Sequence, residues 1–210
     1  MRIAIPIFHR LTALDAVGPY EVLSRLPGAT VHFIAAEPGP KRTENGMLAI
    51  SADLALDELT EPEVIVVPGG LGTRALTQDE TILAWLRHAH EHSQWTTSVC
   101  TGSLLLAAAG ILEGLEATTH WLALETLRQF GVTPVSRRVV EQGKVITAAG
   151  VAAGIDMALT LAARIASEDQ AQAIQLGIEY DPEPPFDSGS PARARPDIVA
   201  LVRGDPERLA

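Results

Sequence analysis

The sequence predicts an α/β protein with a doubly wound, mostly parallel sheet and helices on both of its faces. Short β-rich runs alternate along the chain with longer segments of helical periodicity, and this order is typical of parallel strands joined by crossover helices. The runs expected to form strands are apolar throughout, as they are in sheets covered on both faces. The 210 residues suit one domain, and 47% of them are hydrophobic, which is enough for a sizeable core.

The expected elements can be placed in order from their periodicity and turn signals. Strands are predicted at residues 2–8, 30–36, 63–70 and 95–99. Hairpins are predicted at residues 41–51 and 137–150, with turns at Asn45-Gly46 and Gln142-Gly143. Helices are predicted at residues 13–26, 79–92, 101–109, 151–166 and 167–180, and residues 117–131 are expected to form a brief strand followed by a helix.

The chain changes in character after Tyr180, where proline becomes frequent and the core pattern ends. We therefore expect one α/β domain over residues 1–186 and a C-terminal tail over residues 187–210. A short helix in the stretch DIVALVR (197–203) would dock on the domain or on a partner chain.

The charge and the cysteine content narrow the classes of function. Lys and Arg number 16 against 26 Asp and Glu, so the formal charge is −10 and nucleic-acid binding is not expected. One cysteine cannot form an internal disulfide, which fits a reducing compartment. Pro6 and the pair His9-Arg10 interrupt the first apolar run, which argues against a signal peptide, and no run is long enough to span a bilayer. A cytoplasmic protein that does not bind membranes is the expectation.

Cys100, the only cysteine, follows the predicted strand 95–99 and precedes the predicted helix 101–109. In parallel α/β sheets, ligand chemistry gathers at the carboxyl ends of the strands. The free N–H groups and the positive dipole end of a helix N-terminus stabilise a thiolate, so the position predicts a reactive cysteine with a depressed pKa. A buried cysteine that only fills the core is the alternative.

The dipeptide Gly69-Gly70 ends the predicted strand 63–70, another strand end of the same sheet. Glycine lets backbone N–H groups approach a ligand closely and stabilise developing negative charge, so these amides are candidates for an oxyanion hole. An ordinary tight turn is the alternative.

Asp15 follows the first strand and is therefore expected at the same edge of the sheet as Cys100. Pro19 removes a helical hydrogen bond and makes this helix start irregular. Thr12 and Asp15 have the spacing of a capping box, so a helix-start carboxylate is the alternative to a role in the site.

The histidines are weaker candidates. His88 and His92 are four residues apart on one predicted helix and could share a metal ion, but no cysteine or carboxylate cluster is evident around them or around His90. We therefore expect a solvated helix face and no metal site. His120 begins a helix after a brief strand and is a candidate for contact with a substrate.

Several stretches resemble motifs of the ThiJ/PfpI superfamily: DAVGPYEVL, VVPGG, SVCTGSLLLAAAGIL, ATTHW, AGIDMALTLAARIA and QLGIEYDPEPPF. The resemblance covers about residues 1–186 and implies a flavodoxin-like fold of the class I glutamine-amidotransferase type. The family's signature is a cysteine on a strained elbow near an acidic side chain from the first loop, and these correspond here to Cys100 and Asp15. The resemblance also implies a homodimer, and we expect its interface to lie close to the site. The sequence adds a proline-rich stretch without a core pattern, YDPEPPFDSGSP (180–191), which would lie across the partner.

Details of these motifs indicate one branch of the family. Thr101 stands where the peptidase-like branch has His, and Asp15 stands where the glyoxalase and chaperone branches usually have Glu. The combination most resembles isonitrile hydratases, which implies hydration of a small isonitrile to an N-substituted formamide without a metal or organic cofactor. Cys100 would be the nucleophile and Asp15 the acid and base. Gly69, Gly70 and Thr101 would steady the charge and position the water.

Two alternatives stay open at this point. One is a different cysteine reaction on a small electrophile such as a glyoxal, whose product would be a hydroxy acid. The other is a ligand-binding or redox-sensing module without catalysis, in which the cysteine oxidises to a sulfinate. The same core also resembles the amino-terminal half of arabinose-type transcription activators, which carry a DNA-binding helix-turn-helix pair downstream.

Overall fold

The computed structural model describes residues 1–205 and separates into two compact units, Met1–Ile178 and a second unit that begins at Glu179. In the second unit, helix α8 (Pro196–Gly204) has no buried residue, and the side chain of Phe186 is 77% exposed. The domain boundary expected at residue 186 and the docking of the tail remain predictions.

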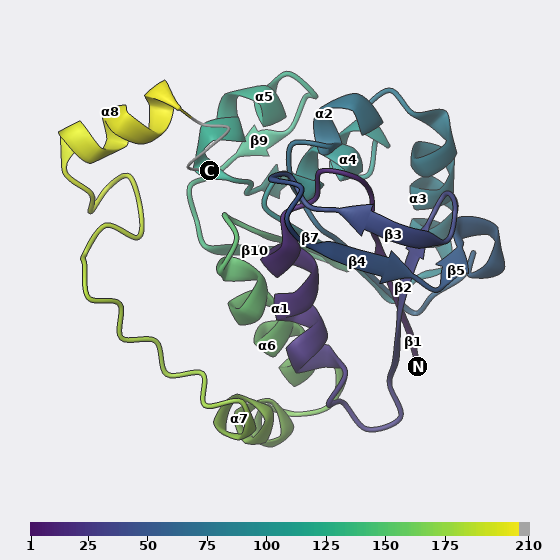
Figure 1. Ribbon diagram of the computed structural model, residues 1–210. Coiled ribbons are helices and arrows are strands. Elements are labelled where there is room, and N and C mark those ends of the chain that lie inside the picture. The colour runs from purple at the N-terminus through teal and green to yellow at the C-terminus, as the bar shows by residue number, and fades with distance from the viewer. Residues whose placement is uncertain (206–210) are drawn as a thin grey trace. The chain divides into compact units, whose positions relative to one another are not determined.

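The first unit is built on a seven-stranded sheet in the order β10-β11-β7-β6-β1-β2-β5 (Figure 1). Every neighbouring pair is parallel except β10 and β11, which form the second predicted hairpin. The strands are β1 (Arg2–Pro6), β2 (Thr30–Ala35), β5 (Leu54–Ala55), β6 (Val64–Val67), β7 (Trp95–Val99), β10 (Val139–Gln142) and β11 (Val145–Ala148). The doubly wound, flavodoxin-like fold predicted from the sequence is confirmed. Because the strand order reverses between β1 and β6, their carboxyl ends border the crevice where such sheets bind ligands.

Two small sheets accompany the large one. The antiparallel pair β3 (Gly39–Arg42) and β4 (Ala49–Ala52) is the first predicted hairpin, and Gly46 in its turn has a φ of 72°. The second small sheet is the parallel pair β8 (Glu116–Ala117) and β9 (Thr133–Pro134).

Helices cover both faces of the large sheet. One face carries α1 (Ala13–Leu23), α6 (Ala153–Ile165) and α7 (Glu168–Gly177). The other carries α3 (Glu80–His92), α4 (Gly102–Ala108), α5 (Leu124–Arg128) and the 3₁₀ turns η1 (Leu56–Glu58) and η2 (Trp121–Ala123), with α2 (Thr73–Leu76) at its border. The helix predicted within residues 117–131 is thus a 3₁₀ turn followed by a short α-helix.

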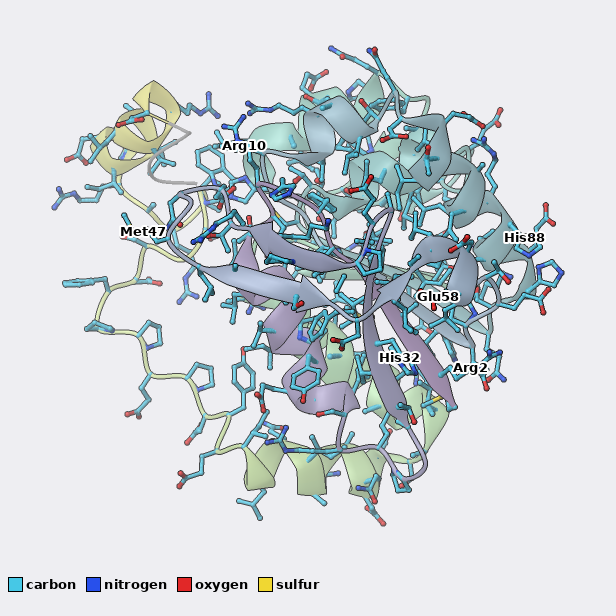
Figure 2. All side chains as sticks on the ribbon, turned by 45° about the vertical axis from the view of Figure 1, so that its right-hand side comes forward. Arg2, Arg10, His32, Met47, Glu58 and His88 are labelled. Carbon is cyan, nitrogen blue, oxygen red and sulfur yellow. The ribbon has the colours of Figure 1, made fainter. Side chains whose placement is uncertain are left out.

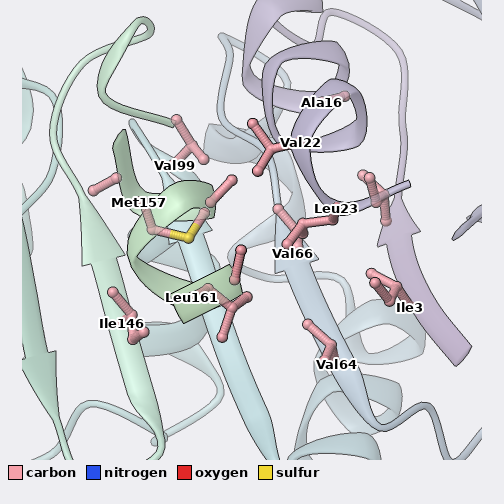
Figure 3. Close-up of a cluster of buried hydrophobic side chains, with 14 of the residues drawn as sticks. Ile3, Ala16, Val22, Leu23, Val64, Val66, Val99, Ile146, Met157 and Leu161 are labelled. Atoms are coloured by element: carbon pink, nitrogen blue, oxygen red, sulfur yellow. The ribbon is translucent and has the colours of Figure 1, made fainter. Parts of the chain in front are cut away.

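The side chains of the central strands alternate between two hydrophobic clusters, as the two-residue period of a strand requires. Ile3 and Ile5 of β1 belong to the cluster under α1 and α6, whereas Ala4 faces α3 and α4. Figure 3 shows the first cluster, in which Met157 and Leu161 of α6 lie over the strands. A fully buried leucine or isoleucine stabilises the fold by about 1.5–3 kcal/mol, so these two layers fix the sheet on which the strand-end loops stand.

Among residues 1–205, no helix combines the length and the apolar character needed to cross a bilayer.

Candidate active site

The turn after β7 holds Cys100 in a left-handed backbone conformation, with a φ of 56°. Such a conformation costs a residue with a side chain about 1–3 kcal/mol, so the surroundings must impose it. The N–H of Cys100 donates to the carbonyl oxygens of Ala148 and Ala149, at 3.1 and 3.0 Å. The carbonyl of Cys100 accepts from Thr119 Oγ1 at 3.0 Å and from Ser103 Oγ at 3.2 Å. These hydrogen bonds hold the elbow in place.

Two glycines let neighbouring segments approach this turn. A Cβ on Gly102, the first residue of α4, would lie 2.1 Å from the carbonyl oxygen of Val67 at the end of β6. A Cβ on Gly69 would lie 2.5 Å from the backbone nitrogen of Thr101 and 2.9 Å from Asp15 Oδ2. Any other residue at either position would therefore push the elbow away from β6 or displace the carboxyl.

Asp15 lies in the first turn of α1 and is completely buried. Its Oδ2 accepts a hydrogen bond of 2.9 Å from the N–H of Gly69, and the carboxyl interacts with the side chain of Cys100. Its Oδ1 receives no hydrogen bond from an N–H or O–H group of the described part of the chain. Thr12 does not cap the helix with its side chain, which instead donates to Glu44 Oε1 at 3.0 Å. The carboxyl is thus aimed at the cysteine and not at the helix end.

Burial raises the pKa of Asp15 from its ordinary value of 3.8 to about 8. The nearby charge of Glu44 acts in the same direction, while the hydrogen bonds from Gly69 and Cys100 oppose the shift. The side chain is therefore mostly protonated at pH 7, as an acid that donates a proton must be.

Burial also raises the pKa of the Cys100 thiol well above its ordinary value, and the charge of Asp15 adds to this shift. The backbone N–H groups of Thr101 and Val151 lower the thiol pKa, but by less. The depressed pKa expected from the helix N-terminus is therefore wrong, because the loss of hydration outweighs the favourable N–H groups. The resting pair is a neutral thiol beside a neutral carboxylic acid.

The hydroxyl of Thr101 is bound to the backbone of Gly70. It accepts from the Gly70 N–H at 2.9 Å and donates to the Gly70 carbonyl at 3.2 Å, and it makes no capping hydrogen bond to α4. The amides of Gly69 and Gly70 therefore hold the side chains of Asp15 and Thr101. The N–H groups that contact the Cys100 sulfur belong to Thr101 and Val151. A role of the Gly69 and Gly70 amides as an oxyanion hole remains a prediction.

His120 directly follows Thr119, whose hydroxyl donates a hydrogen bond to the carbonyl of Cys100 in the elbow. Its Nδ1 accepts from the N–H of Leu122 at 3.4 Å, and its ring lies 2.7 Å from where a Cβ on Gly150 would be. Burial lowers the pKa of His120, so the ring is neutral at pH 7 and its other nitrogen carries the proton. Contact between His120 and a substrate remains a proposal.

The three other histidine candidates contact different parts of the chain. His90 Nδ1 is hydrogen-bonded to Thr96 Oγ1 at 2.8 Å and is partly buried. His88 and His92 lie on the exposed side of α3, beside Glu61.

Three residues that were not predicted from the sequence also border the site. Thr119 belongs to the stretch ATTHW, but nothing in that stretch signals a bond to the elbow carbonyl. Val151 has a φ of 25° and directs its N–H at the sulfur. Glu44 accepts from Thr12 and from the N–H of Leu71, so it joins the β3–β4 hairpin to the loop that carries Gly70. These contacts join segments distant in sequence, which local patterns do not reveal.

The protein is thus a doubly wound α/β protein in which the strained turn after β7 places a cysteine against a buried carboxylic acid. The family model of the DJ-1/PfpI family matches residues 1–164, and the chain belongs to this family. The resemblance noted in the sequence motifs is thereby confirmed.

Known relatives match most of the chain. It is 42% identical over 203 residues to isonitrile hydratase of Pseudomonas putida, which covers 97% of this chain and 89% of the relative. It is 32% identical over 180 residues to the HTH-type transcriptional regulator CdhR of Pseudomonas aeruginosa, covering 83% of this chain and 51% of the regulator. The solved structure of a ThiJ/PfpI family protein from Pseudomonas syringae matches with a TM-score of 0.93 and 36% identity, over 98% of this chain and 86% of that one.

Proposed function

We propose that this protein hydrates small isonitriles, R–N≡C, to N-substituted formamides, R–NH–CHO. The observation that carries the proposal is the neutral, buried pair of Asp15 and Cys100. The terminal carbon of an isonitrile is basic and weakly electrophilic, so it must receive a proton and a nucleophile on the same atom, and the pair offers both. The 42% identity to isonitrile hydratase over most of both chains supports the same reaction.

In the first step, Cys100 Sγ forms a bond to the terminal carbon. Asp15 gives its proton to that carbon, where it becomes the formyl hydrogen, and takes up the proton of the thiol. The product is a thioimidate, in which the carbon is bonded to Sγ and doubly bonded to nitrogen. This exchange needs no free thiolate, which fits the raised pKa of Cys100.

In the second step, water adds to the thioimidate carbon. Asp15 gives its proton to the nitrogen and takes one from the water, so the carboxyl again ends as it began. The carbon–sulfur bond then breaks, the hydroxyl proton passes to sulfur, and the formamide leaves. The N–H groups of Thr101 and Val151 stabilise negative charge on the departing sulfur, and the hydroxyl of Thr101 holds the water.

The proposed enzyme acts as a homodimer whose interface lies close to the site. Exposed apolar side chains flank the site loops: Leu14, next to Asp15, is 40% exposed, and Met47 and Leu48 in the β3–β4 hairpin are 84% and 50% exposed. Met47 and Leu48 are neighbours in the hairpin, and adjacent exposed apolar side chains of this size are typical of an interface.

The similarity to CdhR supports a second candidate, a ligand-binding module without catalysis. A module that senses oxidants through Cys100 has less support than one that binds a ligand. Peroxides attack thiolates, and burial favours the thiol form of Cys100.

The test is product identity. A panel of aliphatic and aromatic isonitriles, together with methylglyoxal, is incubated with the protein, and the products are identified by mass spectrometry. We expect N-substituted formamides from the isonitriles. A hydroxy acid from methylglyoxal and no formamide would support the glyoxalase alternative, and no turnover of any compound would support the binding module.

A further inference from the structure

A cluster of possible metal ligands lies on the surface at the end of α3, in contacts separate from those of the cysteine site. It consists of Glu61, from the segment that precedes β6, and of His88 and His92 from α3. One ligand atom from each side chain lies within 4.8 Å of the other two. Glu61 Oε1 is 3.6 Å from His88 Nε2 and 3.8 Å from His92 Nε2. Two elements distant in the chain thus direct three good ligands at one point.

The histidine pair is spaced and oriented for a shared ion. His88 and His92 are one helical turn apart, and their ring centroids are separated by 4.5 Å. The Nδ1 of His92 donates to the backbone carbonyl of His88 at 2.9 Å, since only a protonated nitrogen can bond a carbonyl. The proton on Nδ1 leaves a lone pair on Nε2, the atom that faces Glu61. This is the hydrogen bond that commonly fixes a metal-binding histidine in its tautomer.

The segment that carries Glu61 is tethered as well. The guanidinium of Arg2 donates to the backbone carbonyl of Glu61 at 2.8 Å, and the Arg2 N–H donates to Glu63 Oε2 at 2.9 Å. The carboxylate therefore projects from a loop bound to β1, and the histidines project from a thirteen-residue helix. Neither side of the cluster must fold around the ion.

We propose that Glu61, His88 and His92 form a binding site for a divalent transition-metal ion such as Zn²⁺. Zinc binds imidazole and carboxylate at about 2.0–2.2 Å, which places tetrahedral ligand atoms about 3.4 Å apart. The separations of 3.6 and 3.8 Å from Glu61 Oε1 need only a small closure, and the ligand nitrogens of the two histidines lie within 4.8 Å of each other. The three side chains are about half exposed and can move by these amounts. Water completes the coordination. His90 is not a ligand, because its Nδ1 is bound to Thr96 and its ring is partly buried.

Figure 2 shows His88 projecting outward at the edge of the molecule, where an ion can reach it from solvent. His32 of β2 lies apart from His88 in the same view. The two histidines therefore offer a matched comparison, because His32→Gln removes an imidazole without touching the cluster.

The test is calorimetric titration of chelator-treated protein with Zn²⁺ alone, which uses no isonitrile and is independent of the proposed reaction. We expect one zinc per chain. Loss of a side chain that hydrogen-bonds a metal ligand commonly weakens metal binding by roughly 10–100-fold. Loss of a ligand itself should weaken it at least as much, so we expect a loss of at least about tenfold in His88→Ala and in Glu61→Gln. His32→Gln and Cys100→Ser should bind as the wild type does. Zinc should also raise the melting temperature of the wild type and not that of His88→Ala.

Three results would overturn the site. They are the absence of saturable binding at one equivalent, binding that persists unchanged in both cluster variants, and binding that is lost in Cys100→Ser. In each case the cluster is an exposed ion pair only. The three side chains are about half exposed, so the variants are expected to fold, and their circular dichroism without zinc verifies this.

Discussion

The carboxyl of Asp15 interacts with the side chain of Cys100, and a 2.9 Å hydrogen bond from Gly69 holds it there. Both groups are buried, and burial raises the pKa of each, so the neutral acid and the neutral thiol are the favoured forms. A buried neutral pair avoids the desolvation cost of an ion pair and keeps two transferable protons side by side. In the proposed reaction, Asp15 would therefore govern the reactivity of Cys100.

We expect Cys100 to react slowly with iodoacetamide at pH 7 and faster as the pH rises beyond 9. The reason is that burial and the charge of Asp15 raise the thiol pKa. Asp15→Asn should shift the midpoint of the rate to lower pH, because the neighbouring negative charge is gone. The rate of alkylation against pH measures both midpoints. A wild-type midpoint at or below about 8.5, the value of a free cysteine, would contradict the raised pKa.

The pH dependence of stability should report Asp15 directly. Its unfolded pKa is near 3.8 and its folded pKa is about 8, so the folded state binds more protons between these values. The contribution of the Asp15 carboxyl to the free energy of unfolding is present in full below about pH 4 and falls as the pH rises to about 8. Relative to Asp15→Asn, the wild type should lose up to about 1.4 kcal/mol per pH unit across this window, measured by urea unfolding. Parallel curves for the two proteins would show that the folded pKa is not raised.

Thr101→Val should lower turnover by at least about tenfold while leaving KM nearly unchanged, if the hydroxyl acts on the water in the transition state. The variant also leaves the Gly70 N–H without its acceptor, so a stability loss of about 1–3 kcal/mol is expected as well. Thr101→Ser keeps the hydroxyl and serves as the control. Steady-state kinetics and urea unfolding of both variants separate the two effects. Normal turnover by a well-folded valine variant would remove Thr101 from the catalytic residues.

Light scattering of dilute protein should give the mass of a dimer. Charges introduced by Met47→Glu and Leu48→Glu in the β3–β4 hairpin should shift it toward monomer, because both side chains are exposed beside the site loops. Leu176→Glu is the control, since Leu176 is 79% exposed on α7, another element. A monomer mass for the wild type would contradict the dimer, and dissociation by the control alone would place the interface elsewhere.

Much of the fold could be predicted because its signals are local. The apolar strands, the amphipathic helices and the Asn45-Gly46 turn are visible within short windows of sequence. Elements such as β5 and α2 are too short to show a period. The meeting of Asp15 with Cys100 could also be anticipated, because the carboxyl ends of parallel strands share one edge of the sheet.

Other properties of the site depend on contacts between residues distant in the chain, which no short stretch of sequence contains. The pKa of Cys100 depends on how completely the elbow is buried and on how close the carboxyl lies. The helix N-terminus alone would lower this pKa, whereas burial raises it. In the same way, nothing near His88 in the sequence indicates that Glu61 lies beside it.

The proposed reaction is tested most directly by the rate of formamide production from one isonitrile by the wild type, Cys100→Ser and Asp15→Asn, measured by chromatography of the product at pH 7. We expect formamide from the wild type and a loss of at least about 1,000-fold in each variant, because the pair works as a unit. Formamide production at near wild-type rate by either folded variant would contradict it.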